Sequence, residues 1–339
     1  MHKFFVCGDI GGTKILLWLG QSINGKIQMH LEHQYDSSSF TDFSEVLCDF
    51  LGKAKTVTKK CNPIAACFAV AGPVVAQRAN LTNLPWLIDS TKISMEFSIP
   101  SIKLINDFEA AALSIEALLD NDLETLQVGK PKVQSMRVVL GAGTGMGVAW
   151  LTWRGKHYVP LSTEAGHMDF APSSELQTNF LEYQRKRFGH VSIERALSGN
   201  GLTDMFNFLQ VGLNGDRKLI QTDINSDVAA MVTDSALNRK HPIAIKALDL
   251  FVEIYGAYAG SLALAGLCQG GVYIAGGIAP KIIGKLQDGS FIRLFCDKGR
   301  YFKMMRDIPV HVVMNTRIGI MGAAQEVQRM LVAKGSSVS

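Results

Sequence analysis

Near its start the chain reads FFVCGDIGGTK (residues 4–14), an apolar run that leads directly into a polar turn with two adjacent glycines. A second stretch, VVLGAGTGMG (residues 138–147), has the same construction far along the chain. Each stretch has strand-like residues on both sides of its glycines. The repeated arrangement indicates two halves of a duplicated fold that hold one polyphosphate between them. A phosphoryl-transfer enzyme is therefore the leading hypothesis.

The first glycine turn has the residues that an anion site needs. Gly11 and Gly12 let backbone N–H groups approach a phosphate without obstruction by a Cβ atom. Thr13 and Lys14 can add hydrogen-bond donors, and Asp9 at the end of the strand could orient a hydrated Mg²⁺ ion. The alternative is an ordinary hairpin turn, which two glycines alone would favour. The flanking polar residues favour phosphate.

The second glycine turn does not match the better-known nucleotide motifs. It has no terminal Gly-Lys-Ser/Thr, as a P-loop would, and strand-like residues rather than a helix follow it, unlike a dinucleotide-binding turn. Gly143, Thr144 and Gly145 instead predict a strand–loop–strand cradle for the distal phosphates of a nucleotide. The alternative, a glycine-rich bulge, does not account for Thr144 at the centre of the loop.

A third glycine pair, Gly276-Gly277, follows the strand-like run 272–275 and precedes a helical pattern. A turn of this shape can lay its backbone against the flat face of an adenine. An ordinary strand–helix turn explains the pair equally well.

Asn106 and Asp107 lie where a predicted strand ends and a predicted helix begins. Ligands of α/β proteins bind at the carboxyl ends of strands, and a carboxylate there can accept the proton of an attacking hydroxyl during phosphoryl transfer. The alternative is that Asp107 only caps the helix.

A second polar cluster is EAGH (residues 164–167), with Glu164 and His167 at its ends. Together with Asp169 it could hold a metal, but the helical His-Glu-x-x-His spacing is missing and no further His cluster supports it. A carboxylate beside an imidazole also suits neighbouring sugar hydroxyls. Glu194 is a further acidic candidate, for which the residue pattern alone favours a helix residue stabilised in the first turn.

Composition indicates a soluble chain of enzyme size. The 339 residues are 47% hydrophobic and 19% charged, with a formal net charge of +4. This mild charge without a Lys/Arg block argues against nucleic acid as a partner, and no uninterrupted apolar run reaches membrane-spanning length. The 6 scattered cysteines include no Cys-x-x-Cys pair, which fits free thiols in a reducing cytoplasm. A cleaved signal peptide would remove the first glycine turn, so none is expected.

Hydrophobic periodicity predicts alternating strands and helices, with a restart of the pattern near Arg137. Asn24-Gly25 lies between two strand-like runs and predicts a hairpin turn. The predicted strands are 4–9, 15–20, 26–32, 64–71, 102–105, 148–153, 271–275 and 311–314, with a further strand ahead of the second glycine turn. The predicted helices are 40–54, 108–119, 243–267 and 320–332.

Seven of these segments together resemble bacterial glucokinases, in kind and in order. They are DIGGTK at 9–14, AGPV at 71–74, TNLPW at 82–86, INDFEA at 105–110, GAGTGMG at 141–147, EAGH at 164–167 and ERALSG at 194–199. The resemblance extends from about residue 5 to the last helix. It implies the hexokinase, actin and Hsp70-like ATPase fold, an α/β chain with two ribonuclease H-like/actin-like domains. A small α/β domain (1–110 plus 318–339) and a larger α+β domain (111–317) would flank a cleft with ATP and glucose.

The resemblance also implies roles for the candidate residues. Asp107 resembles the family's catalytic base, and Mg²⁺ would arrive with ATP, reached by Asp9 only through water. A cytoplasmic homodimer without nucleic-acid or membrane partners is implied as well. The residues that look like glucose ligands are Asn106, Asp107, Glu164, His167 and Glu194. Those that look like nucleotide contacts are Asp9, Gly11, Gly12, Thr13, Lys14, Gly143, Thr144, Gly145, Gly276 and Gly277.

This chain differs from the family and from related groups in three ways, which limit what the resemblance implies. Many family members have Asn where this chain has Lys14, which leaves a phosphate role for Lys14 open. The related repressor and sugar-kinase group has a cysteine-rich zinc motif just after its Glu-x-Gly-His segment, whereas the segment after His167 contains no cysteine. No helix-turn-helix module precedes residue 4, which argues against a transcriptional repressor.

The predicted reaction is the conversion of ATP and D-glucose to ADP and glucose 6-phosphate. One alternative is a kinase for another hexose or an N-acyl amino sugar, such as N-acetylmannosamine. Another is a non-catalytic sugar sensor or structural ATPase of the same fold, against which an intact Asp107 and two intact phosphate loops argue. Polyphosphate as the donor also stays open.

Overall fold

The computed structural model describes residues 3–23, 26–58, 61–81, 84–214, 228–239 and 241–336. The predicted hairpin turn Asn24-Gly25 lies outside these residues, as do Thr82 and Asn83 of the TNLPW segment. The chain divides into two compact units, which we call unit 1 (Met1–Leu118 with Arg317–Ser339) and unit 2 (Leu119–Thr316).

Unit 1 is built on a five-stranded sheet. Its strands are β1 (Lys3–Ile10), β2 (Lys14–Ile23), β3 (Lys26–Asp36), β4 (Pro63–Val70) and β8 (Ile102–Asn106). They lie in the order β3-β2-β1-β4-β8, with β1, β4 and β8 parallel and β2 and β3 added as antiparallel neighbours. All five match strands predicted from hydrophobic periodicity.

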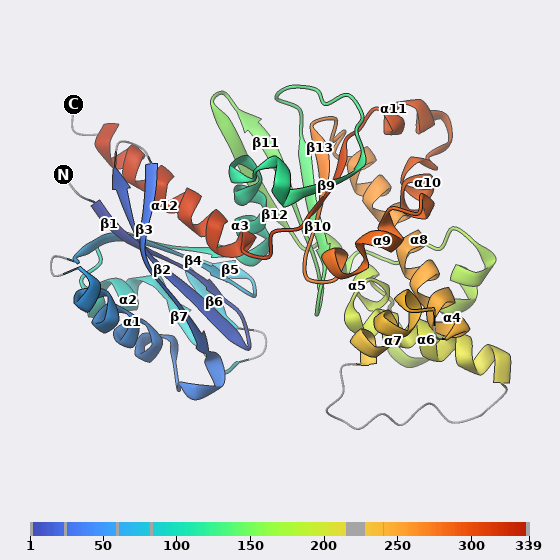
Figure 1. Cartoon of the computed structure of the whole chain (residues 1–339), viewed down its shortest axis with the longest axis horizontal. Helices are drawn as coiled ribbons and strands as arrows, with labels where there is room; N and C mark the ends of the chain where they lie inside the picture. The colour runs from blue at the N-terminus through green and yellow to red at the C-terminus, as the bar shows by residue number, and fades with distance from the viewer. Residues whose placement is uncertain are drawn as a thin grey trace. The chain divides into compact units, whose positions relative to one another are not determined.

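Helices cover both faces of this sheet (Figure 1). They are α1 (Phe43–Val57) and α2 (Ser90–Phe97) on one face, and α3 (Asp107–Ser114) and α12 (Ile318–Ser336) on the other. Because both faces are buried, alternate residues of β1 enter two separate cores. Phe5 and Cys7 pack under α3 and α12, while Val6 and Ile10 pack against α1 and α2.

α12 approaches α3 closely at one point. A Cβ atom on Gly322 would lie 1.8 Å from the carbonyl oxygen of Ala110. The approach therefore requires glycine, and it fixes the helix that begins at Asp107 onto the last helix of the chain.

α3 is shorter than the helix predicted over 108–119. It ends at Ser114, and a 3₁₀ turn, Ile115–Ala117, follows it. The Ser114 hydroxyl donates to the carbonyl oxygen of Ala111 at 2.7 Å. Such a local side-chain bond competes with the helical hydrogen-bond ladder, which accounts for the early end.

A second, small sheet completes unit 1. Its strands are β5 (Val74–Val75), β6 (Arg78–Asn80) and β7 (Leu87–Asp89), paired antiparallel in that order. Its first strand begins at Val74, the last residue of the AGPV segment, and in the sequence the TNLPW segment lies between β6 and β7.

Unit 2 is built on a six-stranded sheet with the order β12-β11-β10-β13-β14-β9. Its strands are β9 (Leu123–Gln127), β10 (Arg137–Ala142), β11 (Met146–Arg154), β12 (His157–Thr163), β13 (Gly271–Ala275) and β14 (Val310–Val313). Its helices are α4 (Glu175–Phe188), α5 (Ile193–Ala196), α6 (Gly199–Asn214), α7 (Val228–Leu237), α8 (Pro242–Ala265), α9 (Ile283–Leu286), α10 (Ser290–Cys296) and α11 (Phe302–Arg306). A single apolar core joins sheet and helices.

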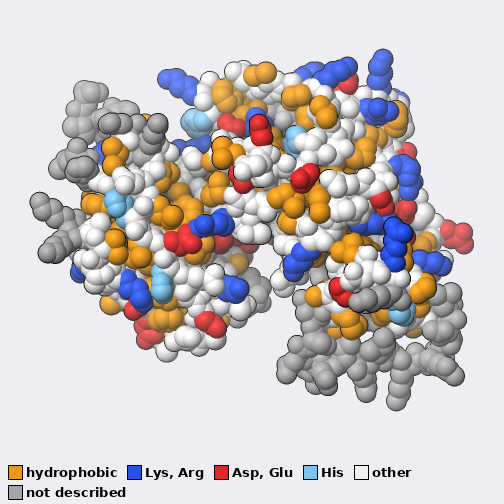
Figure 2. Space-filling model, in the orientation of Figure 1, with side chains coloured by type: hydrophobic (Ala, Val, Ile, Leu, Met, Phe, Trp, Pro, Cys, Tyr) orange, Lys and Arg blue, Asp and Glu red, His pale blue; other side chains and the backbone are white. Residues whose placement is uncertain are grey.

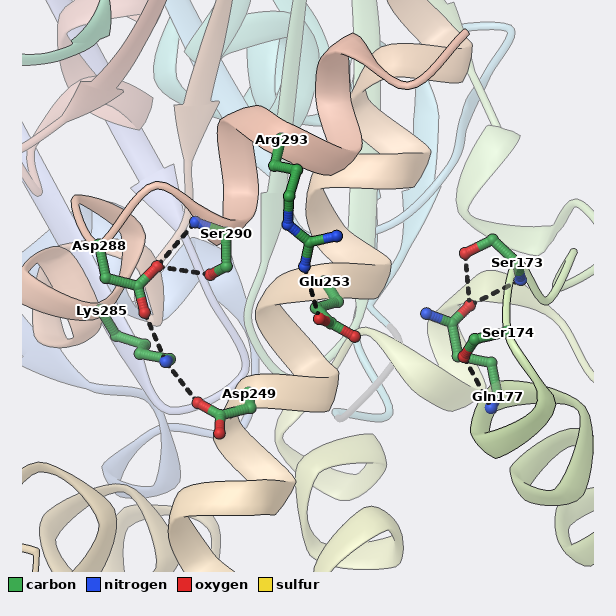
Figure 3. Close-up of polar contacts among 9 residues, drawn as sticks. All are labelled: Ser173, Ser174, Gln177, Asp249, Glu253, Lys285, Asp288, Ser290 and Arg293. Atoms are coloured by element: carbon green, nitrogen blue, oxygen red, sulfur yellow. Dashed lines mark hydrogen bonds and ion pairs between the residues drawn. The ribbon is translucent and has the colours of Figure 1, made fainter. Parts of the chain in front are cut away.

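The central helix of unit 2 is α8, 24 residues long. By length and hydropathy alone it would suffice to cross a membrane, which counting uninterrupted apolar residues did not predict. Its apolar window is 72% buried in the core, as in the core helix of a globular protein. Ion pairs tie its outer face to α9 and α10: Lys285 lies between Asp249 and Asp288, and Arg293 pairs with Glu253 at 2.8 Å (Figure 3).

Charged side chains of both signs are interspersed over the visible face of the molecule (Figure 2). Several form ion pairs, such as Arg78 with Asp89 at 2.7 Å and Arg187 with Asp204 at 2.9 Å. Because most of these pairs are partly exposed, each contributes little to the free energy of unfolding.

Candidate active site

The first glycine turn closes the hairpin between β1 and β2 in unit 1. The Gly11 N–H donates to the carbonyl oxygen of Lys14 at 3.0 Å. The Ser37 hydroxyl donates to the carbonyl oxygen of Gly12 at 2.8 Å, and the Ser37 N–H donates to that of Thr13 at 3.1 Å. Buried Ser37 therefore holds the turn by its carbonyl oxygens, while the side chains of Thr13 and Lys14 are exposed.

Asp9 lies beside this turn at the end of β1, against the start of α12. A Cβ atom on Gly319 would lie 2.4 Å from Oδ2 of Asp9. Burial, and then the negative charge of Asp107, raise the pKa of Asp9 to about 6. The two carboxylates, separate in the sequence, are therefore close enough in unit 1 to influence each other's ionisation.

The end of β8 places Asn106 and Asp107 at the start of α3. Asn106 is the N-cap: its Oδ1 accepts the N–H of Phe108 at 2.9 Å, and its Nδ2 donates to the carbonyl oxygen of Gly72 at 3.1 Å. The N-cap is Asn106 and not Asp107, which is the first helical residue and whose Oδ1 accepts the N–H of Phe108 at 2.9 Å. Its carboxylate stands at a helix N-terminus, where negative charge is favoured.

The second glycine turn joins β10 to β11 in unit 2. The Gly143 N–H donates to the carbonyl oxygen of Gly145 at 2.8 Å, and the Gly199 N–H at the start of α6 donates to that of Gly143 at 2.9 Å. A Cβ atom on Gly143 would meet nothing within 4 Å, whereas one on Gly145 would lie 2.5 Å from Oε2 of Glu194. The turn is thus open on one side and packed on the other.

The third glycine pair packs against the second turn. Gly276 has a φ of +83°, and a Cβ atom there would lie 2.6 Å from the carbonyl oxygen of Ala142. The Ile278 N–H donates to the same oxygen at 3.3 Å. A Cβ atom on Gly277 would meet nothing within 4 Å. Gly276 is therefore required by the close approach, and Gly277 faces open space.

The second glycine turn and the third glycine pair line one cavity of about 900 Å³ in unit 2. Gly143 and Thr144 line it from the second turn, and Gly277 lines it from the third pair. Lys281 is the one cation among its described lining residues. Side chains of α6 and α7 complete the wall, among them Asn200, Leu202, Thr203, Thr233, Asp234 and Leu237. The volume and the mixed apolar and polar wall suit a ligand of nucleotide size.

The EAGH segment directly follows β12, and its last three residues, Ala165–His167, form a 3₁₀ turn. Glu164 and His167 are exposed on either side of a buried centre. A Cβ atom on Gly166 would lie 2.0 Å from the carbonyl oxygen of Met146. The segment therefore rests directly on the start of β11, just after the second glycine turn.

Glu194 connects the EAGH segment to the second turn. Its Oε2 accepts the N–H of Met146 at 2.9 Å, and the Ile193 N–H donates to the carbonyl oxygen of Met168 at 2.8 Å. Glu194 does lie in a first helical turn, that of α5, but its carboxylate is held by the strand beside it. Glu194 and Thr144 also line a second cavity, of about 520 Å³.

Two tyrosines of α8 form hydrogen bonds to the second glycine turn and to the EAGH segment. The hydroxyl oxygen of Tyr255 accepts the N–H of Ala142 at 3.1 Å, where the second glycine turn begins. The Tyr258 hydroxyl donates to the carbonyl oxygen of Ala165 at 2.7 Å, at the centre of the EAGH segment. Sequence reasoning missed both tyrosines, as it missed Ser37. Neither the tyrosines nor Ser37 has a local sequence signal that marks this role.

Among the described residues, no group of three or more His, Cys, Asp or Glu side chains is arranged to hold a metal ion. Asp169, considered beside Glu164 and His167, is paired with His190 at 2.6 Å. The candidate for an indirect metal contact is Asp9, because a carboxylate can accept hydrogen bonds from the water shell of Mg²⁺.

The structure divides the predicted site residues between the two units. Unit 1 has the candidate base and the first turn: Asp9, Gly11, Gly12, Thr13, Lys14, Asn106 and Asp107. Unit 2 has the other two turns and the remaining polar residues: Gly143, Thr144, Gly145, Glu164, His167, Glu194, Gly276 and Gly277. Within each unit, residues far apart in sequence are brought together.

Comparison with known proteins identifies the family of this chain. The family model described as Glucokinase matches residues 6–330. A glucokinase of Nostoc punctiforme is 38% identical over 335 residues, covering 94% of this chain and 97% of that protein. One of Synechocystis is 39% identical over 344 residues, covering 94% and 96%. The crystal structure of a glucokinase from an Antarctic psychrotroph has a TM-score of 0.84 at 28% identity, covering 96% and 99%, and confirms the predicted fold class.

Proposed function

The chain belongs to the glucokinase family and phosphorylates D-glucose with ATP, and we propose that Asp107 is the general base of this reaction. The observation that carries this assignment is the place of Asp107 at the carboxyl end of β8 and the first position of α3, beside Asp9. Asp107 takes the proton of the sugar's 6-hydroxyl as that oxygen attacks the γ-phosphorus in line and ADP leaves. The N-terminus of α3 favours a negative charge at the position of this carboxylate.

Four further residues orient the sugar in this proposal. Asn106 uses one amide hydrogen on Gly72 and has a second for a sugar hydroxyl. Oε2 of Glu194 is occupied by a backbone N–H, so its Oε1 is the oxygen offered to the sugar. The exposed carboxylate of Glu164 and imidazole of His167 complete the set. A sugar ring that is bound at several hydroxyls presents a single oxygen to the γ-phosphorus. This fixed orientation is the entropic contribution to catalysis, because the reacting groups no longer have to find each other in the transition state.

The nucleotide binds to the glycine turns. The cavity of about 900 Å³ takes the adenosine, with its phosphates at the open side of Gly143 and with Lys281 as a cation within reach. The first turn, Gly11 to Thr13 with Lys14, adds donors from unit 1. Mg²⁺ bound to ATP would neutralise phosphate charge, and Asp9 is suited to accept hydrogen bonds from its water shell.

The proposed base lies in unit 1 and three of the proposed sugar ligands lie in unit 2, so the reaction requires both units. We propose that the two units are the small and large domains of the enzyme. We propose that the enzyme is a homodimer in the cytoplasm. Light scattering on the purified chain measures its molar mass and so tests the dimer.

The experiment that tests the function is ADP release with Mg²⁺-ATP in parallel reactions with glucose, mannose, fructose, N-acetylglucosamine and N-acetylmannosamine. We expect kcat/KM for glucose to exceed that for every other sugar by at least about 100-fold. Preference for an amino sugar would keep the mechanism and overturn the sugar-ligand assignment. Turnover with polyphosphate but not with ATP would overturn the nucleotide assignment.

A further inference from the structure

The strand that ends at the proposed base is an edge strand. β8 pairs with β4 on one side and is last in the order of its sheet. On its outer side the side-chain amide of Gln77 takes the place of a strand. The Leu104 N–H donates to Oε1 of Gln77 at 2.8 Å, and Nε2 of Gln77 donates to the carbonyl oxygen of Leu104 at 3.4 Å. A primary amide presents a donor and an acceptor in one plane, as a neighbouring peptide group would.

Gln77 reaches this position from a strained turn. Ala76 and Gln77 form the two-residue turn between β5 and β6, with φ values of +48° and +60°. A hairpin turn of this hand normally has Asn or Asp followed by Gly, because other residues disfavour positive φ. Keeping a glutamine there costs conformational energy that glycine would avoid.

The connection between β4 and β5, on the other side of β5 from this turn, contacts β8 at a second point, nearer the end of that strand. Nδ2 of Asn106 donates to the carbonyl oxygen of Gly72 at 3.1 Å. The contacts at Leu104 and Asn106 therefore hold two alternate residues of the strand immediately before Asp107. On the other side of Asp107, α3 packs against α12, because Gly322 of α12 lies against the carbonyl oxygen of Ala110.

We propose that Gln77 is a positioning residue for Asp107: its amide fixes the free edge of β8 so that the carboxylate one residue beyond the strand stays in register with the reacting hydroxyl. The inference rests on the proposed role of Asp107 as the base. It explains why the turn has a strained glutamine at a position where glycine would be more stable. A misplacement of a catalytic group by about 1 Å is enough to lower turnover markedly.

The test compares two glycine substitutions in the same turn. Gln77→Gly removes the amide and relieves the positive φ, whereas Ala76→Gly relieves the neighbouring positive φ and keeps the amide. For Gln77→Gly we expect kcat to fall at least about tenfold, with the KM for ATP within about twofold of wild type. For Ala76→Gly we expect kcat within about twofold of wild type. Gln77→Met, which keeps side-chain length and backbone strain but has no amide, should reproduce the loss in kcat.

Thermal unfolding of each variant separates positioning from folding. The expected result is a midpoint for Gln77→Gly within a few degrees of wild type despite the loss in kcat. Gln77→Gly and Gln77→Met both within twofold of wild-type kcat would overturn the inference, as would an equal loss in Ala76→Gly. Asp107→Asn in the same assay keeps the outcomes distinct: if it retains turnover, the base assignment fails, and if it is inactive while Gln77→Gly is fully active, only the role of Gln77 fails.

Discussion

Oδ2 of Asp9 lies 2.4 Å from the position that a Cβ atom on residue 319 would occupy, so the Asp9 carboxylate uses space that only glycine leaves open. The substitution Gly319→Ala must displace this carboxylate from the start of α12. We expect kcat with Mg²⁺-ATP to fall at least about tenfold while the fold persists. Steady-state kinetics over a range of Mg²⁺ concentrations measure the effect.

Gly52→Ala is the matched control, because a Cβ atom on this glycine of α1 would meet nothing within 4 Å. Replacing a helical glycine by alanine should stabilise the protein by about 0.5–1 kcal/mol and leave turnover unchanged. Wild-type kinetics in Gly319→Ala would show that the position of Asp9 is not needed for catalysis.

The raised pKa of Asp9 predicts a pH-dependent cost to stability. Its folded-state pKa of about 6 lies above the unfolded value, so the native state binds more protons between about pH 4 and pH 6 and loses stability as the pH rises through this window. Asp9→Asn lacks the cost. It should exceed wild type in free energy of unfolding at pH 7, by up to about 3 kcal/mol, and the excess should vanish below about pH 4.

Urea unfolding at both pH values, without nucleotide, provides the comparison. The same variant should lose activity, since an uncharged amide is a poorer acceptor for the water shell of Mg²⁺. Equal stability of Asp9→Asn and wild type at pH 7 would mean that the Asp9 carboxylate is not destabilised by burial and Asp107.

The two ends of the second glycine turn predict opposite kinetic effects. Gly145→Ala would place a Cβ atom 2.5 Å from Oε2 of Glu194 and push this carboxylate away, so we expect the KM for glucose to rise about tenfold or more. Gly143→Ala meets no protein atom within 4 Å but extends into the space proposed for phosphate, so the KM for ATP should rise instead. Measuring both constants for both variants tests the crossed pattern, and a rise in the same constant for both would contradict it.

The two tyrosines of α8 predict a second pair of variants with opposite kinetic effects. Tyr255→Phe leaves the N–H of Ala142 without its partner, and Tyr258→Phe leaves the carbonyl oxygen of Ala165 without its donor. Each should lower the free energy of unfolding by about 1–3 kcal/mol. Beyond this, Tyr255→Phe should affect mainly the KM for ATP and Tyr258→Phe mainly the KM for glucose. Identical kinetic profiles would show that the two anchors do not act on separate segments.

Much of the fold was predictable because its strands are buried on one or both faces. β1, β4 and β13 are apolar runs that end at glycine or at a polar residue, and they were located to within a few residues. β12 was missed because Pro160 argues against a strand, and the structure resolves this by placing β12 at the edge of its sheet. α4 was missed because its buried face is made partly of polar residues, Gln177 and Gln184 beside Phe180.

The candidate site was predictable as a set of local motifs but not as a set of contacts. Glycine turns and strand ends can be recognised within a few residues. The partners that hold them come from distant parts of the chain: Ser37 for the first turn, Gly319 for Asp9, and Tyr255 for the second turn. Nothing in the local pattern of these residues distinguishes them from ordinary core or helix positions, so only the folded chain shows their role.

The central claim is that Asp107 removes the proton from the attacking hydroxyl, and the most direct measurement is single-turnover phosphorylation of glucose by Asp107→Asn. The amide preserves the shape of the side chain but cannot accept the proton. We predict a rate at least about 100-fold below wild type, with the Kd for glucose, followed by tryptophan fluorescence, within about threefold. A rate within tenfold of wild type at unchanged affinity would contradict the assignment and place the base elsewhere.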